Sequence, residues 1–417
     1  MLSTQGEAYA KARLSNGYLG LPKAIFDRHT RHGVVSFGNA ENFLMRDEML
    51  EYIRSKAIQN LDQNTLTYHE GPFGPNRLRT AMSRHLKTYF HPATPIDSSH
   101  IVFANGVTSL NAMCAISLTN PGEGILLGQP IYGSFAGDLR TPSGCELIYT
   151  PFHGDDQFSP TAVSRYEEAL IHAQETGVAV KALLICNPHN PLALMRFCQK
   201  YRLHLISDEV YALSVYGDGG HQKHFSSALS IDLDQIGVDP DLVHVLYGMS
   251  KDFAMAGLRL GCLVSRSQGL LGAALSMSRF HWPSNVSCSI AASFLEDQVF
   301  LHSFLQKSQH ALKSQHRLAT AALEEAGSLM RRAGIIAGFF LWVDLSKCLD
   351  PAIVRDQGGW AAELDLSRRL GEVGVDMSSG YAYHNEVPGW YRVIFTVDAK
   401  TLEEGLSRII NFYHASN

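Results

Sequence analysis

The decisive stretch of this chain reads Tyr247-Gly248-Met249-Ser250-Lys251-Asp252-Phe253-Ala254-Met255-Ala256-Gly257-Leu258-Arg259-Leu260-Gly261. Apolar segments at 242–246 and 260–264 flank it, and both are typical of buried strands. A lysine between two such strands is seldom buried without a partner, and its amine can attack carbonyls once it has lost water and basicity. Lys251 is therefore a candidate nucleophile, although a solvated lysine on a surface loop is the commoner explanation of so short a motif.

The composition of the chain narrows the classes of function. Its 417 residues are 45% hydrophobic and 18% charged, which is typical of a globular protein with two or three domains. The formal net charge is -5 and no long basic block occurs, so we expect no nucleic-acid partner. The N-terminus does not resemble a signal peptide, and no apolar run approaches the ~18 to 20 residues of a membrane span. We expect a cytoplasmic enzyme without a membrane partner.

The cysteines agree with this expectation. There are seven, an odd number, and no two have the Cys-x-x-Cys spacing of zinc or redox sites. We interpret them as reduced structural thiols in an intracellular protein, and we predict no metal site.

Seven short apolar segments alternate with helical or irregular connections through the middle of the chain. They are His100–Ala104, Ile125–Gly128, Glu146–Pro151, Lys181–Cys186, Leu203–Ser207, Leu242–Leu246 and Leu260–Val264. Continuous apolar strands of this kind indicate an α/β fold, in which helices cover both faces of a mostly parallel, seven-stranded sheet. Ligands bind beyond the carboxyl ends of the strands in such sheets.

The C-terminal part has a different pattern. Long helices are expected from Ser265 to about Ala326, and strand-like and helical segments then follow each other up to Tyr413. This order predicts a smaller α+β domain. We expect an arm at 1–45 that packs with the small domain, a large domain at 46–295 and the small domain at 296–417.

Small residues at the end of the first predicted strand could bind a phosphate. Gly106, Val107, Thr108 and Ser109 lead into a helix, and the start of a helix presents free N–H groups and the positive end of its dipole to an anion. The alternative is an ordinary strand-to-helix turn that Thr108 or Ser109 caps.

Polar or aromatic residues follow other strands in the same way. Tyr132 could stack on a flat cofactor or belong to the core, and Asn190 could hydrogen-bond a phenolic oxygen. Asp208 ends an apolar strand, so it requires a cation, either a protonated pyridine nitrogen or a basic side chain of the fold. Arg392, in a late apolar strand, could bind a substrate carboxylate or form an internal ion pair.

The order of these residues resembles the class I and II aminotransferases, which are pyridoxal phosphate (PLP) enzymes of fold type I. Within that family the chain is most similar to the 1-aminocyclopropane-1-carboxylate synthases and their fungal relatives. The phrases that carry the resemblance are Gly38-Asn39-Ala40-Glu41-Asn42, Arg77-Leu78-Arg79, Ser207-Asp208-Glu209-Val210-Tyr211, Ser250-Lys251-Asp252 and Glu386-Val387-Pro388-Gly389-Trp390-Tyr391-Arg392. The resemblance covers nearly the whole chain.

The resemblance implies roles for the residues closest to the cofactor ring. Lys251 would hold PLP as a Schiff base and then move the substrate's α-proton. Asp208 would keep the pyridine nitrogen protonated, so that the ring accepts electrons. Tyr211 and Asn190 would bind the phenolic oxygen, and Tyr132 would stack on the ring.

It also implies roles at the two ends of the site. The amides of Val107 and Thr108, together with Arg259, would hold the phosphate. Arg392 would bind the carboxylate of an amino-acid substrate, and Glu41 matches a residue that lies close to the substrate in the synthases.

Three departures from the family pattern stand beside this agreement. Gly248 takes the place of a serine that usually offers a hydroxyl to the phosphate. The tyrosine that a neighbouring subunit normally supplies should come from the turn at 68–74, where the register is open. After Asn190-Pro191 a shorter helix replaces the family's longer loop and helix, yet 190–203 still provides the ~10 to 12 residues that a parallel crossover requires.

We expect transamination of an amino acid by a homodimer, and the resemblance to the fungal group implies a setting in secondary metabolism. Elimination is the alternative, either ring closure with loss of a γ-leaving group or cleavage of a carbon–sulfur bond. A catalytically inactive relative is the third hypothesis. Gly248 and the short crossover favour it, whereas the joint presence of Lys251, Asp208, Tyr211 and Arg392 argues against it.

Overall fold

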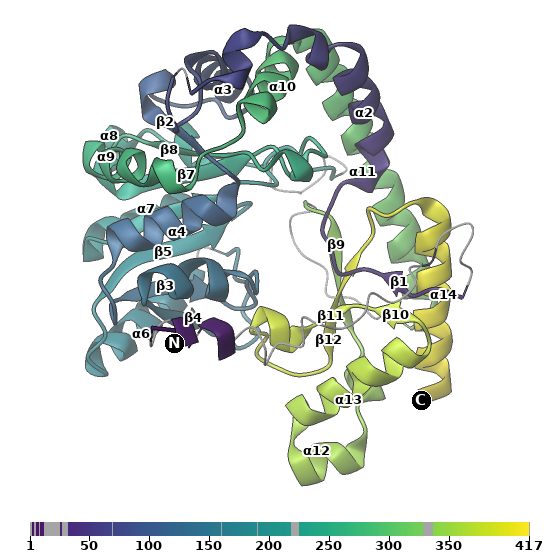
Figure 1. Cartoon of the computed structure of the whole chain (residues 1–417). Coiled ribbons are helices and arrows are strands. Elements are labelled where there is room, and N and C mark those ends of the chain that lie inside the picture. The colour runs from purple at the N-terminus through teal and green to yellow at the C-terminus, as the bar shows by residue number, and fades with distance from the viewer. Residues whose placement is uncertain are drawn as a thin grey trace.

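The computed structural model is organised around a seven-stranded sheet with a smaller second sheet beside it (Figure 1). The structure describes residues 2–3, 6–7, 9–11, 26, 32–68, 70–159, 161–189, 191–217, 225–327 and 337–416. None of the helices in these ranges is long and apolar enough to cross a bilayer.

The large sheet contains all seven segments that the sequence predicts as strands. They are β2 (Ile101–Ala104), β3 (Gly124–Gly128), β4 (Glu146–Thr150), β5 (Val180–Cys186), β6 (His204–Asp208), β7 (Val243–Gly248) and β8 (Gly261–Ser265). Their order in the sheet is β2-β8-β7-β6-β5-β3-β4. Every pair from β4 to β7 is parallel, and β8 is antiparallel to both of its neighbours. The predicted mostly parallel α/β sheet is confirmed.

Helices cover both faces of this sheet, as its apolar strands require. Alternate residues of β5 enter different cores: Leu183 and Ile185 pack into one cluster, and Ala182 and Leu184 into the other. The helices of the first cluster are α2 (Arg46–Ser55), α3 (Asn76–Tyr89), α6 (Ala162–Glu175), α7 (Pro191–Tyr201), α10 (Asn285–Glu296) and the start of α11 (Gln298–Glu325). The second cluster contains α4 (Val107–Leu118) and α9 (Gln268–Met277). Short helices α5 (Thr141–Ser143) and α8 (Leu233–Ile236) complete this part.

The short crossover after Pro191 is compatible with a complete sheet. Helix α7 starts at Pro191 and buries Leu194, Met195 and Phe197 in the first core cluster. Strands β5 and β6, on either side of it, pair in parallel, and Cys186 lies opposite Asp208. The carboxyl ends of these strands are therefore in register although the connection is short.

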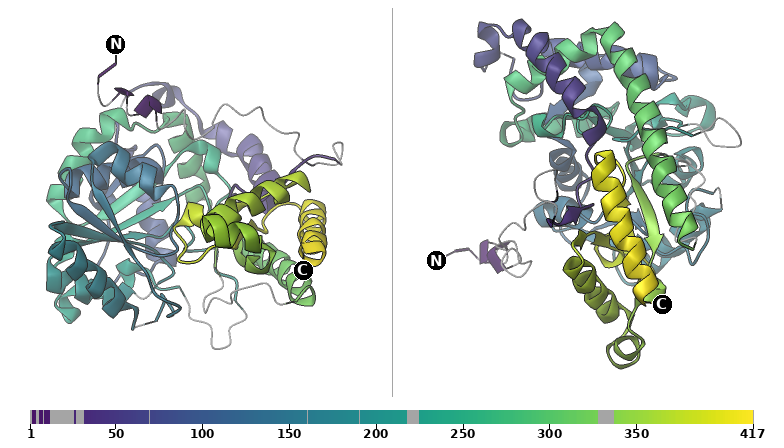
Figure 2. Two further views of the ribbon diagram at one scale, coloured as in Figure 1. Left: turned by 90° about the horizontal axis from the view of Figure 1, so that it is seen from below. Right: turned by 90° about the vertical axis from the view of Figure 1, so that its right-hand side faces the viewer.

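The C-terminal part forms the smaller α+β unit that the sequence predicts. Strands β11 (Ser378–Ser379), β12 (Trp390–Ile394) and β9 (Phe340–Asp344) make an antiparallel sheet. The helices of this part are α12 (Pro351–Gln357), α13 (Gly359–Glu372) and α14 (Ala399–Ser416), and α14 runs beside α11 (Figure 2). Near the N-terminus, β1 (Val35–Ser36) pairs with β10 (Val375–Asp376). The exact boundaries of the arm and the two domains stay predictions.

One buried histidine in the large core leads to a prediction about stability. His85 is fully buried among aromatic rings, with its centroid 5.8 Å from Tyr247 and 5.4 Å from Phe253, and both of its ring nitrogens lack a hydrogen-bond partner. Burial lowers the pKa of His85 from 6.5 to about 3. Below pH 6.5 the imidazole of residue 85 is therefore protonated in the unfolded chain but stays neutral in the folded chain. Because the unfolded state binds more protons, the free energy of unfolding decreases as the pH falls.

We expect His85→Phe to stabilise the protein by about 1 kcal/mol at neutral pH, because the substitution removes two unsatisfied polar atoms. The difference in unfolding free energy between variant and wild type should then grow by about 1.4 kcal/mol per pH unit below 6.5. Urea unfolding at several pH values measures this difference. His244→Phe is the control, because His244 is equally buried but bonds His204 and Ser265 at 2.9 Å, so its loss should destabilise the fold. A constant difference across this pH range would contradict the prediction for His85.

Candidate active site

A large cavity of about 1440 Å³ lies at the carboxyl edge of the main sheet. The segment 38–41, strands β9 and β12 and the loops that follow the sheet strands contribute to its wall. Nine of the ten residues that the sequence assigns to the site line it: Glu41, Val107, Thr108, Tyr132, Asp208, Tyr211, Lys251, Arg259 and Arg392. The tenth, Asn190, lies outside the described residues.

Lys251 follows β7 and directs its amine into this cavity. Its Nζ donates a hydrogen bond of 2.6 Å to the carbonyl oxygen of Ala40 and lies 5.9 Å from the centroid of the Tyr211 ring. Burial lowers the pKa of the Lys251 amine, and the charge of Arg392 lowers it further. Glu41 and Asp208 act in the opposite direction. The net effect favours the neutral amine, which is the nucleophilic form.

Asp208 ends β6 and is only 7% exposed. The backbone N–H of Val210 donates to its Oδ1 at 3.2 Å, and no basic side chain in the described part of the chain forms an ion pair with it. Burial raises the pKa of Asp208 to about 7, although the charge of Lys251 opposes this shift. A buried carboxylate of this kind gains from a cation in the cavity, as a protonated pyridine nitrogen would be.

The start of α4 forms an anion cradle together with two glycines. Gly106 has φ 105° and ψ 163°, a conformation open almost only to glycine. A Cβ at this position would lie 2.3 Å from Nη2 of Arg259, and a Cβ at Gly261 would lie 2.7 Å from the amide nitrogen of Val107. The glycines thus allow the guanidinium and the first N–H groups of α4 to converge, and both kinds of group attract a phosphate.

Arg392 lies in β12 across the cavity and is only 6% exposed. Its Nη2 donates to the carbonyl oxygen of Gly38 at 2.5 Å, and its Nε has no partner. The guanidinium carbon lies 4.7 Å from the Tyr383 ring centroid and 5.6 Å from that of Phe340. No carboxylate of the described residues pairs with Arg392, so the alternative of an internal ion pair has no support there. An incoming carboxylate would satisfy the guanidinium.

Three further predicted residues differ in how they meet the cavity. Tyr132 is half exposed, so its ring is available for stacking. Tyr211 packs edge-on against Phe339, with the ring centroids 5.1 Å apart. Glu41 lines the cavity, but its carboxylate forms an ion pair of 2.8 Å with Arg46.

Several residues that line the same cavity were not predicted from the sequence, among them Asn111 and Asp138. Asn111 follows Thr108 by three positions, and this spacing on a helix would have placed both on one face. No sequence pattern predicts a place for Asp138 in the site, because its position beside the cavity depends on how the residues after Tyr132 fold back onto α4. Asn187, beside the predicted Asn190, has a structural role instead, since it donates hydrogen bonds to Glu209 and to the Ser226 carbonyl at 2.9 Å.

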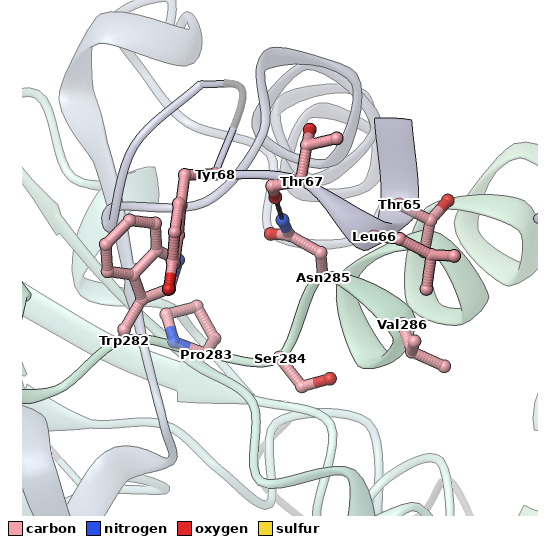
Figure 3. A pocket seen from close by; sticks show the side chains of 9 residues that line it. All are labelled: Thr65, Leu66, Thr67, Tyr68, Trp282, Pro283, Ser284, Asn285 and Val286. Atoms are coloured by element: carbon pink, nitrogen blue, oxygen red, sulfur yellow. Dashed lines mark hydrogen bonds between the residues drawn. The ribbon is translucent and has the colours of Figure 1, made fainter. Parts of the chain in front are cut away.

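A second, shallow hollow of about 460 Å³ lies between residues 65–68 and 282–286 (Figure 3). The rings of Tyr68 and Trp282 lie side by side with their planes tilted by 52° and their centroids 5.3 Å apart, and Asn285 donates a hydrogen bond of 2.5 Å to the Thr67 carbonyl. The hollow contains neither Lys251 nor any other predicted site residue of the main cavity.

Comparison with known proteins identifies the family. The family model described as aminotransferase class I and II matches residues 33–409. The chain belongs to this family. It is therefore a PLP-dependent enzyme that acts on amino acids, as the resemblance implied, and the hypothesis of a seven-stranded PLP fold of type I is confirmed.

The relatives of this aminotransferase family member include both reaction types considered above. The chain is 29% identical over 404 residues to 1-aminocyclopropane-1-carboxylate synthase 2 of Arabidopsis thaliana, and the alignment covers 91% of this chain and 79% of the synthase. It is 30% identical over 392 residues to the probable aminotransferase gliI of Aspergillus fumigatus, and the alignment covers 90% of this chain and 88% of that protein. The structure of the aromatic aminotransferase from Pyrococcus horikoshii OT3 shares the fold, with a TM-score of 0.71, 21% identity and coverage of 92% and 96%.

The residues of the cavity fit PLP. The N–H groups at the start of α4 would bind its phosphate, the Asp208 carboxylate would bind its protonated ring nitrogen, and the Lys251 amine would react with its aldehyde. Each of these three groups faces the cavity without a strong ionic partner among the described residues. The individual roles of the site residues stay predictions.

Proposed function

We propose that this enzyme transfers the amino group of an α-amino acid to a keto acid. The observation that carries the proposal is the joint presence in one cavity of the Lys251 amine and of the buried Arg392, whose Nε has no partner. The first can act on the α-carbon, and the second can hold the α-carboxylate that defines such a substrate. An inactive relative would not require either arrangement.

The chain supplies positioning and proton transfer for this reaction. When bound, PLP supplies an electron-accepting ring that stabilises the negative charge left on the α-carbon. Lys251 would anchor the cofactor through its amine. Once released, the amine would take the α-proton and deliver it to another atom, and the lowered pKa of Lys251 favours the unprotonated amine that this step requires. Asp208 keeps the ring nitrogen protonated. Arg392 holds the carboxylate so that the α-proton faces Lys251.

Elimination is the second candidate, because the relatives include 1-aminocyclopropane-1-carboxylate synthases. Glu41 lines the cavity, and it matches a residue that lies near the substrate in the synthases, which supports elimination. In the free protein the Glu41 carboxylate pairs with Arg46 at 2.8 Å, so a contact with the substrate would compete with that ion pair. Both reactions begin with the same proton removal and differ in what leaves afterwards.

A product assay tests the proposal. We expect purified enzyme with PLP to form keto acid from amino acids only when a second keto acid is present as acceptor. S-substituted cysteines should be tested in parallel. Release of ammonia and thiol without an acceptor would contradict transamination and establish the elimination reading.

We propose further that the enzyme is a homodimer. Leu66 and Tyr68 at the shallow hollow are 84% and 83% exposed, and Phe280, two residues before Trp282, is 79% exposed. Apolar side chains this exposed are often covered by a partner. The turn that begins at Tyr68 is also where the family resemblance places the residue that reaches the neighbouring subunit. The cytoplasmic location and the setting in secondary metabolism stay predictions from the sequence.

The double variant Leu66→Asp with Phe280→Asp tests this interface. We expect it to weaken the dimer at least ~100-fold, because each subunit would bury two carboxylates in place of two apolar side chains. Light scattering after size exclusion measures the mass. Leu364→Asp is the control, because Leu364 is 75% exposed but lies on α13 of the small unit. A double variant that stays dimeric would place the interface elsewhere.

A further inference from the structure

The phosphate cradle lacks a donor that the family pattern provides. Gly248 ends β7 where a serine hydroxyl is expected, and the structure leaves no space for a side chain there. A Cβ on Gly248 would lie 2.8 Å from the Leu260 carbonyl oxygen and 3.3 Å from Cγ2 of Val107. The cradle therefore needs another group to complete the hydrogen bonds of a phosphate.

Asp138 is placed to be that group. It lies on the π-helical turn η5 (Ala136–Arg140), which packs against the first turns of α4. The amide of Asn111 donates a hydrogen bond of 3.3 Å to Oδ2 of Asp138, and Thr108 bonds the same carboxyl group. Thr108, Asn111, Asp138 and Arg259 all line the cavity. The carboxyl group thus stands directly beside the residues that would hold the phosphate.

A second observation shows that this corner lacks a ligand. Asn111 is only 2% exposed, yet its Oδ1 has no hydrogen-bond partner. Buried amide oxygens are seldom left unpaired, so a group with a donor, such as a water bound beside the phosphate, would complete the contacts of Asn111 and leave the proton of Asp138 for the phosphate.

Burial, and not the surrounding charge, favours a proton on Asp138. Burial raises the pKa of Asp138 to about 6, against the hydrogen bonds from Asn111 and Thr108 and the charge of Arg259. Asp208, at the end of β6, is the other acidic group that interacts with it. On β4, Glu146 is already paired with Arg140. A phosphate dianion in the cradle would favour the protonated form further, because like charges repel.

We propose that protonated Asp138 donates a hydrogen bond to the phosphate of the cofactor and so replaces the hydroxyl that Gly248 lacks. Binding takes up one proton from solvent, which stays on the carboxyl group, and no covalent bond changes. The proposal rests on the PLP dependence of the family, and it makes Asp138 a cofactor-binding residue.

Pyridoxamine 5′-phosphate and pyridoxamine differ only in the phosphate, so a comparison of their binding isolates the contribution of that group. Neither compound can bond covalently to Lys251. The ratio of their dissociation constants, measured by calorimetry from about pH 5.5 to about pH 8.5, reports the phosphate alone. We expect the wild-type preference for the phosphate to fall as the pH rises, with uptake of a proton on binding. Asp138→Asn keeps a donor at every pH, so its preference should change with pH only through the second ionisation of the phosphate at about pH 6, and its proton uptake should be smaller. Asp138→Ala should lose about 10-fold or more of the preference at low pH.

Asp234→Asn, an exposed site on α8, is the matched control and should follow the wild type. The same pH profile and proton uptake in wild type and Asp138→Asn would overturn the proposal, whatever happens to Asp138→Ala. Wild-type protein that binds neither compound would overturn it together with the assignment of the cofactor. Wild-type binding with a flat profile would overturn the role of Asp138 alone.

Discussion

Lys251→Ala is expected to abolish turnover and the visible absorbance of covalently bound PLP. The substitution removes both the amine that anchors the cofactor and the base that moves the α-proton, and proton transfer by a positioned base alone contributes about 10²- to 10⁴-fold. We therefore expect activity to fall by at least ~10⁴-fold. Absorbance spectra and the product assay measure the two effects on the same sample.

Lys200→Ala is the matched control for this prediction. Lys200 is exposed on α7, its Nζ pairs with Glu167 at 2.6 Å, and neither residue lines the cavity. Its loss should change neither the spectrum nor the rate. A Lys251→Ala protein that keeps full activity would refute the assignment of Lys251.

Arg392→Leu is expected to weaken substrate capture while leaving the fold intact. Truncating one member of a buried charge pair costs roughly 2–5 kcal/mol, so kcat/KM for amino acids should fall by about 30-fold or more. The free protein pairs Arg392 with no carboxylate of the described residues, so its thermal midpoint should stay the same or rise, because an uncompensated buried charge is removed. Amines that lack the carboxylate should lose much less rate than the matching amino acids.

Arg369→Leu provides the opposite pattern as a control. Arg369 lies on α13 of the same unit, where it bonds Asp365 at 2.8 Å and the Cys348 carbonyl at 2.6 Å. Its loss should lower the thermal midpoint and leave KM unchanged. If Arg392→Leu lowered stability in the same way and kept its KM, Arg392 would be a structural residue.

The strands of the large sheet could be predicted because each is a continuous apolar run that must be buried on both faces. Their order could not. Strands β2 and β8 have 156 residues between them, and β8 pairs antiparallel with both β2 and β7, whereas the other pairs of the sheet are parallel. Such pairing depends on which edges remain free once β3 to β7 have associated, and local pattern contains no information on that choice.

The candidate site divides in a similar way. Residues at strand ends, such as Asp208 and Lys251, could be predicted because each follows a buried strand and because their order along the chain resembles that of the aminotransferase family. Asp138 could not, because the bond to it from Asn111 joins residues 27 positions apart through a turn that has no sequence signal. The pairing of Glu41 with Arg46 likewise depended on side-chain conformation.

The sequence by itself determined the fold type, through the apolar periodicity of the strands, and the family, through the resemblance that the order of polar residues at strand ends carries; it also singled out Lys251 as the predicted anchor of the cofactor. Only the tertiary structure decided which charges are left without a partner. It shows that Arg392 forms no ion pair with a carboxylate of the described residues, that Gly248 has no space for a hydroxyl and that Asp138 bonds Asn111 beside the start of α4. Burial and distance decide these properties, and both arise when segments far apart in the chain come together.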